Sequence, residues 1–220
     1  QNGEFMLNFM SDHINRHAEY HEVAASFARF LADAQWADEF ARLPAEWSNE
    51  RKMLHLMKAA MRANKVASYL PDFSIMVPRR DRVKMRLILG THSPSGLEVF
   101  RDVQEKVEKQ ELEMRHNLRE GDSPQVSLFS SADIAAFQQE QKGVGCKANR
   151  ARAEEIIVDF LQGRTRAFPG PMFNLAMEEV PIRRTHLNKV IMDMRDRGVV
   201  RFDLPAPKRV PQPNTAISLV

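Results

Sequence analysis

Cysteine is nearly missing from this 220-residue sequence, which contains one, Cys146. A single thiol excludes an intrachain disulfide framework and a zinc site built from several cysteines. No apolar run approaches the roughly 18 residues that a membrane-spanning helix needs. The polar start of the sequence also lacks the apolar core of a signal peptide. We therefore expect a cytoplasmic protein with no membrane partner.

A strong excess of one charge sign is also missing, because the formal net charge is only +3. The charge is nevertheless divided along the chain. Residues 147–220 carry 13 Lys and Arg against 8 Asp and Glu, whereas residues 1–146 carry 19 against 21. A basic carboxyl-terminal end is where a DNA or RNA partner would bind. The alternative is a mildly basic, solvated surface without that function.

The last seventy or so residues carry three short apolar-periodic segments, whose spacing is typical of amphipathic helices. Their apolar faces are Ile156, Ile157, Phe160 and Leu161; Phe173, Ala176, Met177 and Val180; and Leu187, Val190, Ile191 and Met194. Gly198 then suits the end of the third helix. A strand at 199–202, a proline-rich loop and a last strand at 216–220 follow. This order predicts a winged helix-turn-helix domain over residues 150–220.

The third helix of that domain, expected at 182–197, is the predicted recognition helix. Its core face leaves Thr185, Lys189 and Met192 on the opposite side, with Arg184 and Asn188 along the flanks. Basic residues at its first turn and at the tip of the wing, the proline-rich loop at 203–214, would contact nucleic acid. The predicted nucleic-acid-binding residues are Arg183, Arg184, Thr185, His186, Asn188, Lys189, Lys208 and Arg209. The alternative is that Arg183 and Arg184 pair with Glu178 and Glu179.

Residues 1–118 read as part of an α/β domain, with 119–149 as a linker that contains a short helix. Apolar strands are expected at 5–9, 73–77 and 85–90. Helices are expected at 12–34, with this helical region extended to 43, and at 49–66 and 97–118. A strand, loop and helix in succession is typical of an α/β sheet. We predict that strand 5–9 pairs with 85–89 or 73–77 in one sheet. Pairing across a second molecule would instead make an oligomer.

Three further groups of residues are candidates for chemistry. Thr91, His92 and Ser93 follow an apolar strand, so they are a candidate ligand rim, with a satisfied polar loop as the alternative. His13, His17 and His21 recur every four residues, but no other ligand pattern accompanies them, so we predict no metal site. Cys146 has no identified histidine base and is expected to be inert. No catalytic residue is predicted.

Two segments carry a resemblance to a known family. Residues 3–10 (GEFMLNFM) with 14–16 (INR), and residues 86–97 (RLILGTHSPSGL), are similar to segments of the three-Cys-motif partner proteins. The predicted winged helix is similar to the domain that closes those proteins. The resemblance covers nearly the whole chain, which is expected to be the carboxyl-terminal portion of such a protein or a relative that lost the front.

The resemblance implies a partial Rossmann-like sheet of the S-adenosylmethionine methyltransferase type. In the family, the cofactor and catalytic motifs belong to the amino-terminal half, which has no counterpart before Glu4 here. We therefore expect no cofactor in this chain, and S-adenosylmethionine only if the missing half is supplied. The implied protein partner is an iron–sulfur protein with three cysteines. Three hypotheses follow: a nucleic-acid-binding module, part of an S-adenosylmethionine-dependent enzyme, or a protein-interaction scaffold.

Overall fold

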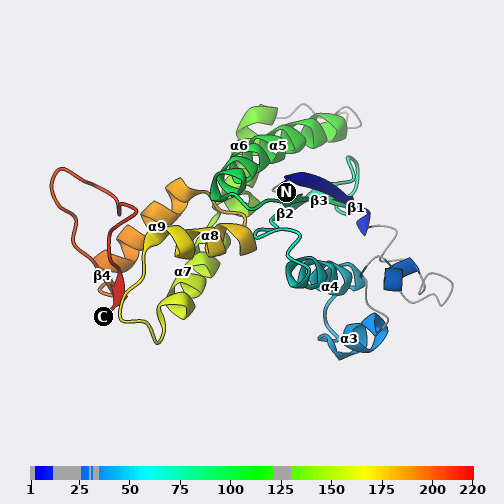
Figure 1. The fold of residues 1–220 in the computed structure, drawn as a ribbon. Coiled ribbons are helices and arrows are strands. Elements are labelled where there is room, and N and C mark those ends of the chain that lie inside the picture. The colour runs from blue at the N-terminus through cyan, green and yellow to red at the C-terminus, as the bar shows by residue number, and fades with distance from the viewer. Residues whose placement is uncertain (1–2, 12–25, 30, 32–34, 121–129) are drawn as a thin grey trace. The chain divides into compact units, whose positions relative to one another are not determined.

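The computed structural model describes residues 3–11, 26–29, 31, 35–120 and 130–220, and Figure 1 shows its ribbon. The chain divides into two compact units, unit 1 (Gln1–Ser93) and unit 2 (Pro94–Val220). Helices and small antiparallel sheets together make an α+β fold. The sequence predicts a boundary after residue 118, and the helix that begins at Pro94 belongs to unit 2. Most of the helix predicted at 12–34 falls outside the described residues.

Unit 1 has a three-stranded sheet in the order β1-β3-β2. Its elements are β1 (Phe5–Phe9), α3 (Trp36–Arg42), α4 (Asn49–Ala63), β2 (Asp72–Met76) and β3 (Val83–Gly90). β1 pairs with β3 from Phe5 opposite Gly90 to Phe9 opposite Arg86, which confirms the predicted shared sheet. β1 and β2 both pair antiparallel with β3. The connection at 77–82 explains this for β2 and β3, because a parallel crossover needs a dozen or more residues.

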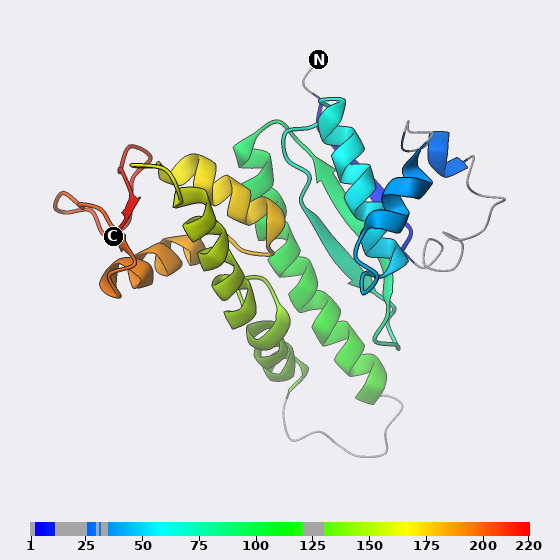
Figure 2. The same cartoon turned by 90° about the horizontal axis from the view of Figure 1, so that it is seen from below.

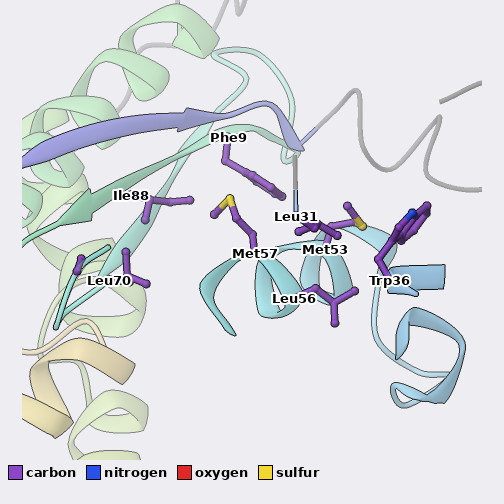
Figure 3. Packing of buried hydrophobic residues seen from close by; sticks show 9 residues of the cluster. Phe9, Leu31, Trp36, Met53, Leu56, Met57, Leu70 and Ile88 are labelled. Carbon is purple, nitrogen blue, oxygen red and sulfur yellow. The ribbon is translucent and has the colours of Figure 1, made fainter. Parts of the chain in front are cut away.

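The core of unit 1 lies between this sheet and α4. Phe9 and Ile88 point from β1 and β3 toward Met53 and Met57 of α4 (Figure 3). All four of these side chains are buried, with at most 4% exposed. The methionine-rich stripe of α4 therefore packs as core, as its helical spacing predicts. Truncating one of these side chains to alanine removes about 2–5 kcal/mol of unfolding free energy.

A polar network crosses the same face of unit 1. The Arg86 guanidinium donates from Nε to Glu50 Oε1 (2.5 Å) and from Nη1 to Asp72 Oδ2 (2.8 Å). Lys58 pairs with the other Asp72 oxygen, and Ser11 donates to Glu50. Burial alone would raise the pKa of Asp72, but Lys58 and Arg86 outweigh it and hold that pKa below its usual value. Each carboxylate of the network is therefore paired with a cation of the same network.

Unit 2 is mostly helical. Its elements are α5 (Pro94–Glu120), α6 (Ser131–Lys142), α7 (Lys147–Leu161), α8 (Pro169–Glu179), α9 (Arg184–Asp196), β4 (Val200–Arg201) and β5 (Ser218–Leu219). α5 contacts α6 and α8, and α7 contacts α8 and α9 (Figure 2). β4 and β5 pair antiparallel, and Ala167 forms an isolated bridge to Ile217 just before β5. Three backbone segments thus meet at this small sheet.

Local sequence explains the helices of unit 2. The apolar face predicted for α9 (Leu187, Val190, Ile191 and Met194) is buried throughout. Pro169 starts α8 at a position where its missing N–H has no helical partner. Gly198 follows α9 at φ +72°, and Val199 N–H donates to Met194 O, so the glycine closes the helix as expected. No helix among the described residues is long and apolar enough to cross a membrane.

Candidate nucleic-acid interface

The two arginines at the start of α9 are held by carboxylates of α5. Arg183 Nε donates to Asp102 Oδ1 at 2.6 Å, and Arg183 Nη1 donates to Glu105. Arg184 Nη1 donates to Glu98 Oε1 at 2.5 Å. The alternative partners suggested by the sequence, Glu178 and Glu179, belong to α8. The carboxylates that accept these bonds stand instead on α5, about eighty residues away in sequence.

His186 turns inward from the same first turn. A Cβ added to Gly145 would lie 2.0 Å from His186 Nδ1, so the ring packs directly on that glycine. Nδ1 is buried and has no hydrogen-bond partner among the described residues. Burial, reinforced by the nearby positive charge of Arg150, lowers the pKa of His186 from its ordinary value of 6.5. A neutral ring wedged against the backbone is a packing residue of unit 2.

The outward face of α9 retains the other predicted contacts. Thr185 and Lys189 are exposed, and Asn188 is half-buried on a flank. Asp193 and Asp196 are also exposed farther along the helix. The amino-terminal half of this face is therefore polar or basic, and its carboxyl-terminal half is mixed in charge.

The loop between β4 and β5 carries the predicted basic tip. Lys208 and Arg209 are both exposed. The backbone turns just before them, where Lys208 N–H donates to Pro205 O. Near the other end of the loop, Gln212 N–H donates to Thr215 Oγ1 at 2.8 Å. These bonds and the prolines of the loop restrict the backbone of this long connection, which carries the two cations away from the small sheet.

A buried arginine of α5, which sequence reasoning missed, fastens this helix to α8. Arg101 is 1% exposed and donates from Nε to Met177 O (2.6 Å) and from Nη2 to Glu178 O (3.0 Å). Its Nη1 donates to Gln104 Oε1 at 2.5 Å. The guanidinium thus caps the last turn of α8, where helical carbonyls lack intrahelical donors. The signal in the sequence was two polar residues, three apart, inside the apolar stripe of α5.

Glu108 extends this contact one turn farther along α5. Its Oε1 accepts from Gln104 Nε2 at 2.6 Å, and its Oε2 accepts from the Val144 N–H at 3.0 Å. Burial raises the pKa of Glu108 despite these bonds. α5 therefore holds both the end of α8 and the segment that leads into α7.

A groove of about 520 Å³ runs between α7 and α9. Its lining is mixed in charge and consists of Lys147, Arg150, Ala151, Glu154, Val190, Asp193, Asp196 and Arg197. Arg197 Nη2 donates to Glu154 Oε2 at 2.6 Å across it. Carboxylates on both helices make this groove a poor place for a phosphate.

The candidate ligand rim of unit 1 is occupied by its own hydrogen bonds. Thr91 is buried, and its Oγ1 donates to Glu4 Oε1 at 2.6 Å and accepts from the Ser93 N–H at 2.9 Å. His92 Nδ1 lies 2.9 Å from Ser68 Oγ. These contacts match the alternative of a satisfied polar loop. The structure brings the three residues together but gives them partners within unit 1.

Metal and thiol chemistry gain no further support. No group of three or more His, Cys, Asp or Glu among the described residues could hold a metal ion. The histidines at 13, 17 and 21 fall outside those residues. Cys146 is buried at the position just before α7.

No family model, curated protein or solved structure matches the chain.

Proposed function

We propose that unit 2 is a winged-helix module that binds the phosphate backbone of duplex DNA or structured RNA. The element order supports it, because α7, the bridge at Ala167, α8, α9, β4, the long loop and β5 follow one another as a winged helix requires. The core face of α9 supports it too, since it leaves Thr185 and Lys189 exposed.

The single observation that carries the proposal is the exposed pair Lys208 and Arg209 on the loop after β4. Cations on such an arm can reach phosphate without contacting bases. Lys189 on α9 adds a third exposed cation. The first turn of α9 contributes less than its sequence predicts, because Arg183 and Arg184 already bind carboxylates.

The test is duplex binding at several salt concentrations. The slope of log affinity against log salt is negative, and each lost phosphate contact reduces its magnitude by about 0.9. Lys208→Ala/Arg209→Ala should therefore weaken binding to all sequences and reduce the magnitude of this slope by roughly 2. Lys109→Ala/Lys142→Ala is the matched control, because both lysines are exposed on other helices of unit 2. Equal slopes for the parent and the wing variant would remove phosphate binding by the wing.

A second candidate function is a protein-interaction scaffold. Asp193 and Asp196 on the exposed face of α9, and the mixed charge of the groove beside it, favour this candidate. Both features repel phosphate and suit a peptide that carries both charge signs. Asp193→Ala/Asp196→Ala should strengthen duplex binding if α9 lies against nucleic acid. Unchanged duplex binding, with loss of a protein partner, would favour the scaffold.

We also propose that unit 1 is the closing part of a methyltransferase-like, Rossmann-type domain. The family resemblance supports this origin, and an iron–sulfur three-cysteine protein is the partner that it implies. The chain alone should not bind S-adenosylmethionine, since the expected glycine-rich loop is not in this sequence. Calorimetry with S-adenosylmethionine, with and without an added amino-terminal half, tests it. Binding by this chain alone would contradict the proposal.

A further inference from the structure

The acidic residues that hold Arg183 and Arg184 form one stripe on α5. Glu98, Asp102 and Glu105 are spaced by four and three residues, so they lie on one face of the helix. Each of them accepts a bond from one of the two arginines. We call these three residues the acidic stripe. It gives the two arginines the kind of anionic partner that a nucleic-acid backbone would otherwise supply.

Other side chains hold α5 in place besides the acidic stripe. Arg101, on the neighbouring face, is buried and binds two carbonyls of α8. Glu108 holds the Val144 N–H one turn farther on. α5 can therefore stay docked when the bonds of the stripe are broken.

The pairs of the stripe are open to solvent. The Arg184 and Glu98 side chains are each 36% exposed, and Arg183 and Asp102 are 30% and 50% exposed. Ion pairs at such sites contribute little to stability, because water screens them. A phosphate that approaches the first turn of α9 can therefore replace a carboxylate after a side-chain rotation, without undocking α5.

We propose that the first turn of α9 is a phosphate-binding surface that the acidic stripe occupies in the free protein. This proposal rests on the nucleic-acid-binding function proposed above. The stripe competes with phosphate for the two arginines, so it lowers the affinity of the protein for a nucleic-acid duplex. It also lowers the salt dependence of that affinity. Phosphate binding then depends first on Lys189, Lys208 and Arg209.

Neutralising the stripe tests this inference. Glu98→Gln/Asp102→Asn/Glu105→Gln should release two arginines, which makes the negative slope of log affinity against log salt steeper by about 1.8. The ratio of duplex affinities at 50 and 200 mM salt should then grow roughly 12-fold relative to the parent. Circular dichroism and an unfolding curve check that the variant keeps the fold.

Two further variants separate the stripe from a general charge effect. Glu113→Gln/Asp133→Asn/Glu140→Gln removes the same charge from the far part of α5 and from α6, and it should leave the slope unchanged. Adding Arg183→Gln/Arg184→Gln to the stripe variant should abolish the gain. A gain that survives this addition, or that the control reproduces, overturns the inference.

The outcomes also distinguish this inference from the proposed function. If the parent binds duplex through the wing and the stripe variant binds with the same slope, the inference fails and the function stands. If neither the parent nor the stripe variant binds, both fail. If only the stripe variant binds, the masking is confirmed and the wing contributes little.

Discussion

Replacing Arg101 with methionine should destabilise unit 2 and leave unit 1 unchanged. The guanidinium is 1% exposed and donates to Met177 O and Glu178 O at 2.6 and 3.0 Å. Methionine fills a similar volume but leaves both buried carbonyls without these donors. Arg101→Lys keeps the charge yet loses the planar fork that reaches two acceptors at once.

The magnitude follows from the number of bonds lost. A hydrogen bond from a charged donor contributes about 1.5–3 kcal/mol, so two such bonds contribute about 3–6 kcal/mol. Removing a buried charge recovers part of its desolvation cost. We expect Arg101→Met to lower the unfolding free energy of unit 2 by about 2–4 kcal/mol, and Arg101→Lys by about half of that.

The distribution of aromatic residues allows an assay that separates the units. Both tryptophans, Trp36 and Trp47, belong to unit 1, and unit 2 has neither tryptophan nor tyrosine. Tryptophan fluorescence in urea therefore follows unit 1, whereas far-ultraviolet circular dichroism also follows the helices of unit 2. Lys109→Met is the matched control, because this exposed residue stands on the same helix.

A loss of less than about 1 kcal/mol in Arg101→Met would refute this reasoning. It would mean that the cost of burying the guanidinium cancels its bonds to α8. A parallel shift of the fluorescence transition would refute a different step, because the two units would then unfold together.

Two other predictions use the segment before α7 and the histidine packed on it. Gly145→Ala should lower the unfolding free energy by about 2–5 kcal/mol, because its φ is +71° and the added methyl group would clash with the His186 ring. Gly163→Ala at the same φ meets open space and should lower it by about 1–2 kcal/mol. Equal losses in urea unfolding would contradict the close contact. Because the folded-state pKa of His186 lies below 6.5, its contribution to stability is present above pH 6.5 and is lost as the pH falls from there through the folded pKa. The stability of unit 2 should therefore fall over that window in the parent and less in His186→Gln, and identical pH profiles would show that another group titrates there.

The sequence by itself determined the elements whose partners are simply apolar. The buried stripe of α9 was readable because a helix that covers a core repeats its apolar residues with the period of the helix. The apolar run at Phe5–Phe9 likewise predicted a paired strand, since a strand with so many apolar side chains must bury them away from water. Gly198 at the end of α9 follows from backbone conformation alone. In each case the cause acts within a few residues.

Tertiary structure alone decided what the charged residues do. Arg183, Arg184 and His186 have the composition of a recognition helix, yet their partners are carboxylates of α5 and the backbone at Gly145. The spacing of the acidic stripe could be recognised in the sequence, but this spacing does not predict which cations the stripe binds. Apolar burial is non-directional and tolerates many neighbours, whereas an ion pair needs one particular group within a few ångströms. Such a distance, between residues about eighty apart in the chain, is fixed only when α5 docks on α8.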